Sequence, residues 1–240
     1  MNIRIIKTLM ASFVLILSQQ SSALMIDLYS GNGSVGGADS EITRLQGPID
    51  SAFGSIFTAG DFTNARNGIA AQVINRHGAW DSTTDFANAG GNASAQWISD
   101  NASGVSQGYT ALYAIDFFLP FAVIGSASMD FYWLVDNLLG DSNNAGVFLN
   151  GNAVAGISGG GFTSTSSALA LDVASLLVSG TNTLYINAVD VGGPGGLLFS
   201  AALDITEGRV DSDPEGNVPA PATLLLLGIG LIALARSKRA

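Results

Sequence analysis

The stretch "SMDFYWLVDNLLGDSNNAGVFLNGNAVAGI", from Ser128 to Ile157, decides the fold class of this chain. In its first part every second residue is apolar, while Ser128 and Asp130 begin the opposite face. Successive side chains of a strand point to opposite faces, so this period of two predicts a half-buried strand over Ala127–Val135. The residues expected on its inner face are Met129, Phe131, Trp133 and Val135.

The second part of the stretch predicts a β-hairpin. Asn150-Gly151 is the dipeptide that favours a two-residue type I′ turn, because both of its central residues take positive φ. We therefore expect a strand over Ala145–Leu149 and a returning strand over Ala153–Ile157. Valine at position 151 should destabilise the fold through backbone strain.

Further strands are indicated on the C-terminal side of this hairpin. Thr183–Val189 and Leu197–Ile205 have the composition and alternation of strands, and the glycine-proline cluster from Gly192 to Gly196 predicts the turn between them. The chain contains 30 glycines and few stretches with helical periodicity. Several short strands at this spacing predict an all-β fold, a β-sandwich or jelly roll.

Two segments resemble the galactose-binding-like jelly roll, which occurs as an accessory module of glycosidases. They are "DNLLGDSNNAGVFLNGNAV" (136–154) and "LDVASLLVSGTNTLYINAV" (171–189). In the resemblance, Asp136-Asn137 leads into the hairpin and Asp172-Val173 opens a short turn of helix. The similarity covers roughly Trp80 to Ile205 and supports the fold far more than a function.

Aromatic residues are the candidates for sugar binding, because an exposed ring can stack on the apolar face of a sugar. The candidates for glycan stacking are Trp80, Trp97 and Tyr109. The competing interpretation is that large aromatic residues fill the core of a sandwich, and we expect this of Trp97 and Trp133.

The N-terminal segment has the layout of a secretory signal peptide. Arg4 and Lys7 form a basic region, an apolar stretch runs from Leu9 to Leu17, and the small residues Ser21-Ser22-Ala23 follow. We therefore expect the translocon to export the chain, with cleavage after Ala23.

The C-terminal segment predicts contact with a membrane. "VPAPATLLLLGIGLIALARSKRA" runs from Val218 to Ala240, and its residues 222–235 carry no charge. These 14 residues are short of a full span, but the apolar stretch is hydrophobic on all sides and is followed by bases, which tend to stay cytoplasmic. We expect a short transmembrane helix, at least while the protein is processed.

The same segment resembles the sorting signal of PEP-CTERM proteins. The residues that carry the resemblance are Val218, Pro219, Ala220, Pro221, Arg236, Lys238 and Arg239, with Ala220 where the family usually has glutamate. The resemblance implies a Gram-negative bacterium that makes exopolysaccharide. It also implies processing by an exosortase at the inner membrane, and then release to the cell surface or the extracellular matrix.

Composition limits what the mature protein can do. Between the signal peptide and the sorting signal lie all 19 acidic residues and only four bases, all arginines, a net charge of −15. Such a surface repels the phosphates of nucleic acids, so we expect no nucleic-acid partner. The chain has no cysteine, which excludes disulfides, a thiol nucleophile and a thiolate metal site. We assign 24–206 to the sandwich domain and 207–217 to an acidic linker.

Three motifs in the chain match functional patterns, but their contexts do not fit. Gly156–Gly160 reads G-x-S-x-G around Ser158, yet no strand-to-helix turn is predicted there, and His77 is the only histidine in the chain. Gly31, Gly33 and Gly36 match a dinucleotide fingerprint without a βαβ unit. We read them as a flexible exposed segment, in which Gly33→Val should have almost no effect.

The third motif, Asp211 to Gly216, begins like a calcium-binding EF-hand loop. Its twelfth position is Ala222 instead of glutamate, so we read it as a solvated acidic linker. Modules of the resembling fold often carry a structural ion. Calcium in the sandwich therefore remains open, without named ligands and with no other cofactor expected.

The sequence therefore predicts an exported, non-catalytic β-sandwich protein of the cell surface or of an exopolysaccharide or biofilm matrix, with glycan as its expected partner. Two alternatives stay open. One is a secreted carbohydrate-active hydrolase that uses a pair of carboxylates, although no pair can be chosen from the sequence. The other is a purely structural matrix protein.

Overall fold

The computed structural model describes residues 23–102 and 108–208. The chain divides into two compact units, Met1–Gly208 and Arg209–Ala240, and all described residues belong to the first. Most of the expected signal peptide, most of the acidic linker, the EF-hand-like stretch and the whole sorting signal lie outside the described residues. In the part described, no helix has both the length and the apolar character needed to cross a membrane.

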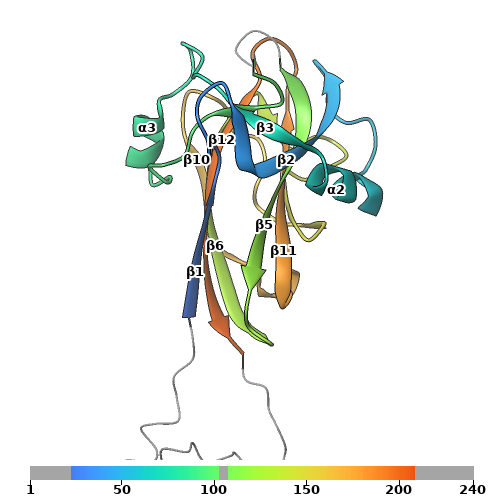
Figure 1. Cartoon of the computed structure of the whole chain (residues 1–240), viewed down its shortest axis with the longest axis vertical. Helices are drawn as coiled ribbons and strands as arrows, with labels where there is room; N and C mark the ends of the chain where they lie inside the picture. The colour runs from blue at the N-terminus through green and yellow to red at the C-terminus, as the bar shows by residue number, and fades with distance from the viewer. Residues whose placement is uncertain (1–22, 103–107, 209–240) are drawn as a thin grey trace, which may run out of the picture. The chain divides into compact units, whose positions relative to one another are not determined.

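The described chain is an antiparallel β-sandwich, which confirms the predicted all-β fold. One layer has the strand order β10 (Ser166–Asp172), β6 (Ile124–Asp136), β12 (Gly196–Glu207) and β1 (Ala23–Tyr29). The other layer has the order β2 (Ala38–Ile49), β5 (Tyr109–Leu119), β11 (Gly180–Val189) and β8 (Val147–Leu149). Figure 1 shows these layers side by side.

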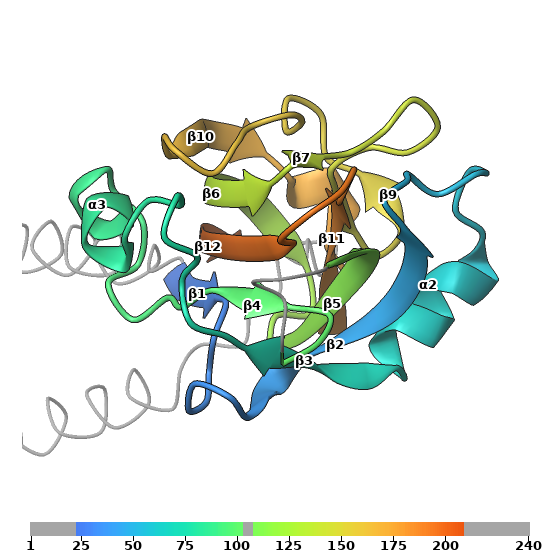
Figure 2. The same cartoon turned by 90° about the horizontal axis from the view of Figure 1, so that it is seen from above.

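Four shorter strands and three short helices complete the described fold. β3 (Ile69–Val73) and β4 (Ile98–Ser99) join β2 to β12, so the two layers form one hydrogen-bonded sheet that curls round the core (Figure 2). β7 (Leu138–Leu139) pairs with β11, and β9 (Asn152–Ala153) pairs with β8. The helices are α2 (Ala59–Arg66), α3 (Thr83–Asn88) and the 3-10 turn Ala174–Leu176.

The main core lies between the two layers, where the alternation in the sequence predicted it. Met129, Phe131, Trp133 and Val135 of β6 are all buried there, with Phe131 stacked on Phe199 of β12. Burying side chains of this size from both layers supplies the main apolar contribution to stability. The expected core position of Trp133 is confirmed.

Two smaller apolar clusters lie on the outer faces of the layers, each under a helix-bearing segment. The segment that contains α3 covers Leu134 of β6 and Leu198 of β12, which point outward from the sheet. The buried residues that it contributes are Ile74, Trp80, Phe86, Ala95 and Trp97. An aromatic cluster lies between α2 and the outer face of the second layer; Phe148 of β8 and Tyr185 of β11 pack there against Phe62 of α2 and against Phe53 and Phe57, which precede α2. The sandwich is therefore thicker than two bare sheets.

The hairpin turn forms as predicted, but its returning strand is shorter. Asn150 and Gly151 both have positive φ, 53° and 81°, as a type I′ turn requires. The returning strand is only Asn152–Ala153, and the predicted extension to Ile157 is wrong. Gly156, with φ 88°, turns the chain away from the ladder.

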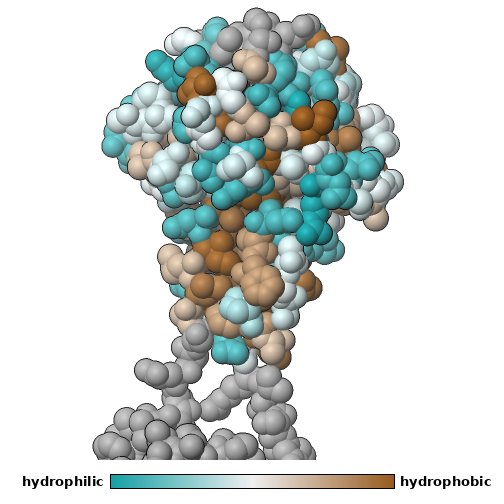
Figure 3. Space-filling view, viewed as in Figure 1, coloured by the Kyte–Doolittle hydropathy of each residue, from teal (hydrophilic) through white to brown (hydrophobic). Residues whose placement is uncertain are grey.

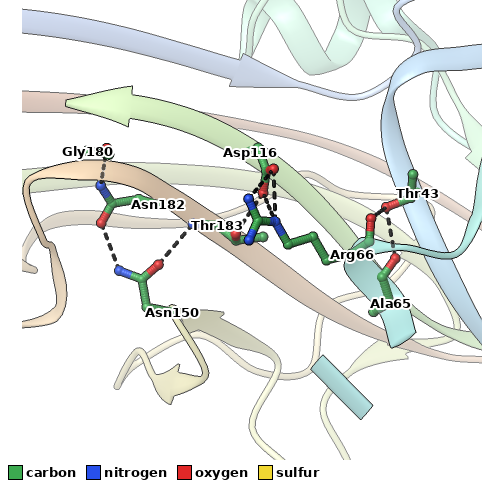
Figure 4. A network of polar contacts seen from close by, with 8 residues as sticks. All are labelled: Thr43, Ala65, Arg66, Asp116, Asn150, Gly180, Asn182 and Thr183. Atoms are coloured by element: carbon green, nitrogen blue, oxygen red, sulfur yellow. Dashed lines mark hydrogen bonds and ion pairs between the residues drawn. The ribbon is translucent and has the colours of Figure 1, made fainter. Parts of the chain in front are cut away.

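Side-chain amides hold this hairpin in place, as Figure 4 shows. Asn150 Nδ2 donates to Asn182 Oδ1 at 2.7 Å, and Asn150 Oδ1 accepts the backbone N–H of Thr183 at 3.0 Å. On the same strand, Thr183 Oγ1 donates to Asp116 Oδ1 at 2.7 Å. Asp116 also pairs with Arg66 at the end of α2, at 2.9 Å. The hairpin and the end of α2 are thus both hydrogen-bonded to the β5–β11 pair, at Thr183 and at Asp116.

The glycine motif near the N-terminus is a built turn, which corrects our reading of a flexible segment. The buried carboxylate of Asp39 accepts the backbone N–H groups of Gly31 and Asn32 at 2.8 and 3.1 Å. A Cβ atom at position 33 would lie 2.6 Å from the carbonyl oxygen of Ala38. Valine at position 33 would therefore disturb this turn, so the expectation of almost no effect was wrong.

One side of the sandwich is open in its lower half. β2 pairs with β5 only from Tyr109 to Ile115, and β1 pairs with β12 alone, so both β1 and the end of β5 are edge strands. Figure 3 shows apolar surface over this lower half, beneath a largely hydrophilic upper half. Leu24 and Ile26 of β1 are only partly buried against the core, in agreement with this view.

Candidate functional site

Acidic residues gather at the upper end of the sandwich, where β2, β4, β6 and β11 end. Asp100, Asp136 and Asp190 are buried there, and the exposed Asp50 lies next to Gly192. We call these four residues the loop-end acids. They come from four separate segments, so only the fold brings them together.

The buried loop-end acids serve mainly to hold loops. Asp100 Oδ1 accepts the backbone N–H of Tyr109 at 3.2 Å, and its Oδ2 accepts Gln46 Nε2 at 3.3 Å. Arg44 donates to the backbone carbonyl of Asp100. Asp136 Oδ2 accepts the indole N–H of Trp80 at 2.8 Å. The contacts of Asp100 join β2, β4 and β5 at the upper end, and that of Asp136 holds the segment before α3 on β6.

Asp190 is the least satisfied of these residues. Its Oδ1 accepts the N–H of Gly192 at 2.8 Å, whereas its Oδ2 is buried without a hydrogen-bond partner among the described residues. A Cβ at position 108 or 195 would lie 2.6 or 2.8 Å from that oxygen, so both positions require glycine. Burial raises the pKa of Asp190, and the negative charges of Asp50 and Asp100 raise it further.

Burial also raises the pKa of Asp136, against the lowering effect of its bond to Trp80. The exposed fractions of Asp136 and Asp190 are 6% and 1%, so a ligand in solution does not reach either carboxyl. Among the described residues, no three side chains of the types that bind metals come together as a metal site. We therefore treat the loop-end acids as structural.

A groove of about 350 Å³ lies elsewhere, on the outer face of the β10–β6–β12 layer. We call it the outer-face groove. Its polar side chains are those of Ser126, Ser128, Asp172, Asp204 and Thr206, and small residues form the rest of the lining: Gly125, Ala127, Ala170 and Ala174. A volume of this size is at the lower end of the range for small-molecule sites.

Strand register places the polar side chains of the groove. Ser128 of β6 is paired with Asp172 of β10 on one side and with Asp204 of β12 on the other. Neighbouring strands lie about 4.8 Å apart, so the Cα atoms of the two aspartates are about 10 Å apart. In the next row, Ser126 Oγ and Thr206 Oγ1 are hydrogen-bonded at 2.8 Å.

A β-bulge turns Asp172 toward the groove. Ala168 and Leu171 pair with Phe131 and Met129, so β10 uses three residues where β6 uses two. The extra residue reverses the alternation, and Asp172, which would otherwise face the core, faces outward. Ala170 has φ 53°, and its N–H donates to Asp130 Oδ1 at 2.7 Å, which fixes the bulge.

The structure buries two of the three predicted stacking residues. Trp80 and Trp97 are 2% and 1% exposed, and they pack on each other with ring centroids 4.4 Å apart. Neither ring can stack on a sugar in this arrangement, which corrects that expectation; the core position of Trp97 is confirmed. Tyr109 is half-buried at the start of β5, near the loop-end acids, and remains a candidate.

Other predicted residues are not brought together. Ser158 is exposed in a loop with no helix after it, and His77 packs on Trp80 and accepts the N–H of Ala79. No described hydrogen bond joins the two, so the serine-hydrolase pattern is not formed. Ala23, the expected cleavage residue, is the first residue of β1 and pairs with Thr206.

The residues of the outer-face groove were missed by sequence reasoning. Ser126, Ser128 and Asp130 already showed that the outward face of β6 is polar. Asp172 and Asp204 could not be added, because their place beside β6 depends on strand order and on the bulge.

Comparisons with solved structures return distant carbohydrate-related proteins. A β-(1,4)-mannanase, GH26-CBM35, from Podospora anserina aligns with TM-score 0.33 and 14% identity, over 70% of this chain and 28% of that one. A family 35 carbohydrate-binding module from Clostridium thermocellum aligns with TM-score 0.30 and 12% identity, over 55% and 86%. CBM35 of Abf62 from Cellvibrio japonicus gives TM-score 0.30 and 11% identity, over 75% and 92%.

The match to a known protein family is confined to the C-terminal segment of the chain. No curated protein matches the chain. This chain spans only 28% of the length of the mannanase, and the similarities to solved structures concern the fold alone. Residues 217–239 match the family described as the PEP-CTERM protein-sorting motif. The chain therefore carries the sorting motif of an exported protein processed at the membrane, joined to a β-sandwich domain.

Proposed function

We propose that this protein is exported, is processed by an exosortase, and then binds glycan without catalysis at the cell surface or in an exopolysaccharide matrix. The observation that carries the glycan part is the outer-face groove, an open site lined by hydroxyls and carboxylates. Hydroxyl and carboxylate oxygens are the groups that hydrogen-bond to sugar hydroxyls. The sorting motif at residues 217–239 supports the export part of the proposal.

Binding is favoured over hydrolysis by the positions of the acids. A glycosidase needs a general acid with a raised pKa beside the scissile bond. The described acids whose pKa is raised are Asp136 and Asp190, which are buried among the loop-end acids and lie outside the groove. Their hydrogen bonds to Trp80 and Gly192 give them a structural role instead.

The test uses the processed protein purified from its host and the polysaccharide that the same cells release. In affinity gel electrophoresis, we expect the polysaccharide to slow the protein, with no new reducing ends after incubation. New reducing ends would overturn the non-catalytic assignment in favour of a hydrolase. Unchanged mobility would overturn glycan binding and leave the purely structural alternative.

Processing is tested on the same material. Intact-mass analysis should show loss of Met1 to Ala23 and of most residues after Pro221. Full-length chain recovered from outside the cell would contradict export through this sorting route.

A further inference from the structure

We propose that the outer-face groove selects a cationic amino sugar, a hexosamine whose nitrogen is a free ammonium group. This inference rests on the proposed glycan binding and names the class of glycan. It follows from three features of the groove: the character of its lining, the arrangement of its hydroxyls and the charge around it.

The lining lacks the usual means of holding a neutral sugar. Neutral sugars are commonly bound by stacking on aromatic rings. None of the nine lining residues is aromatic, and the apolar residues of the lining are glycines and alanines only. Polar and charged contacts must therefore supply most of the binding free energy.

The hydroxyls form a compact row on adjacent strands. Ser126 and Thr206 face each other across the β6–β12 pair, and Ser128 lies two residues further along β6. These three hydroxyls can each donate to or accept from a sugar hydroxyl. They give the groove the chemistry of a polyol site, with Asp172 and Asp204 at its two sides.

The charged side chains that β1, β6, β10 and β12 place on the lower half of this face are all aspartates. Asp27 and Asp130 flank Ala202 in one row, and Asp172 and Asp204 flank Ser128 in another. The ion pair formed by the described residues is Arg66 with Asp116, on the other layer. The remaining described bases are also engaged elsewhere, because Arg44 and Arg76 donate to backbone carbonyls. Within the described part of the chain, Asp172 and Asp204 therefore have no ion-pair partner, and a ligand that enters the groove meets both carboxylates.

A cationic sugar satisfies both sets of groups at once. Its ammonium can donate to Asp172 or Asp204, and charge-assisted hydrogen bonds are stronger than neutral ones. Its ring hydroxyls can bond to Ser126, Ser128 and Thr206. A metal ion fits less well, because no three metal-binding side chains converge within the described residues.

The experiment compares two matched ligands on the processed protein by isothermal titration calorimetry. The ligands are the tetramers of glucosamine and of N-acetylglucosamine, which differ in the charge on nitrogen. We expect the glucosamine tetramer to bind at least about ten-fold more tightly at low salt. The difference should shrink as salt rises from about 0.05 to 0.5 M, where screening is strong.

Variants locate the binding. Asp204→Asn and Asp172→Asn should each weaken glucosamine binding by about five-fold, the effect of one exposed charge pair. Asparagine at 172 keeps the Oδ1 acceptor that caps the N–H of Ala174, so the turn should persist. Glu41→Gln, on β2 of the other layer, removes the same charge and should leave binding unchanged.

The outcomes separate this inference from the proposed function. Equal binding of both tetramers, weakened by Asp204→Asn, would overturn the cationic preference and retain glycan binding. If Glu41→Gln weakened binding of the glucosamine tetramer as much as Asp204→Asn, the groove would not be the binding site. Tetralysine binding as tightly as the glucosamine tetramer would show a general cation site and would also overturn the proposal.

Discussion

The outer face of the β6–β12 pair is built in two different ways along its length. In the upper half, Leu134 and Leu198 point outward and are covered by the segment with Trp80, Phe86 and Trp97. In the lower half, Ser128 and Asp204 point outward and line the open groove. The same two strands thus change from an apolar to a polar outer face, so a strand's outward residues show which part of a sheet is covered.

The covered half should be far more sensitive to mutation than the bare half. Trp97→Ala removes a buried ring that packs on Trp80, and large-to-small changes of this kind cost about 3–5 kcal/mol. For a domain of this size, we expect the melting temperature to fall by about 6–20 °C. Ser128→Ala in the bare half should shift it by less than about 2 °C. Similar shifts in both variants would show that the upper segment does not stabilise the sheet.

The second layer extends the comparison, because α2 covers the turn of the hairpin. Gly151 has φ 81°, and a Cβ there would lie 3.3 Å from the ring of Phe62. Valine at this position should cost about 1–3 kcal/mol through backbone strain. The melting temperature should fall by about 2–12 °C. The control is Gly54→Val, since a Cβ at Gly54 meets no atom within 4 Å and its φ is not positive. Equal shifts in the two variants would contradict the hairpin placement.

A single hydrogen bond tests how the covering segment is attached. The N–H of Asn92 donates to Ser200 Oγ of β12 at 3.0 Å. Ser200→Ala should cost about 1 kcal/mol and should speed hydrogen exchange at the Asn92 amide. Unchanged exchange at that amide would mean that this hydrogen bond does not help to hold the segment on β12.

The smallest expected effect concerns pH. The pKa of Asp136 is raised above 3.8 in the folded state, mainly by burial. The unfolded state therefore binds fewer protons above pH 3.8, and the contribution of Asp136 to stability is lost as pH rises through its folded pKa. Asp136→Asn keeps an acceptor for Trp80 and removes this loss. The stability of the variant relative to wild type should then increase from pH 4 to pH 7, measured by denaturant titration. If the stability difference between the variant and wild type stayed constant with pH, burial would not raise the pKa of Asp136.

The sequence allowed prediction of strands that alternate clearly or lie next to a clear turn signal, as β11 and β8 do, whereas β5 and β1 were missed. β6 and β12 alternate clearly, because each has a core side and an outer side, and both were found. β5, "YTALYAIDFFL", is buried on both faces over most of its length, so it has no alternation to detect. β1 begins at Ala23, directly at the expected end of the signal peptide, so it was not separated from that segment.

The candidate site was less predictable than the fold. Tryptophans were natural choices for sugar stacking, but composition does not reveal that Trp80 and Trp97 belong to the covering segment and are buried against the sheet. The outer-face groove depends on the pairing of three strands that are distant in the sequence. It also depends on one inserted residue in β10, whose effect on Asp172 appears only once the register is known.

The pairing of Ala23 with Thr206 has a mechanical consequence. β12 lies between β1 and β6, with seven residue pairs to β1, and the chain continues from its lower end toward the sorting motif. The groove lies at this same end, because Asp204 and Thr206 line it and β12 ends at Glu207. If that end is held while a polymer pulls on the groove, the load crosses only the last residue pairs of β12, which β1 braces on the other side from Ala23 to Met25. The core further up the sheet then lies outside the path of the load.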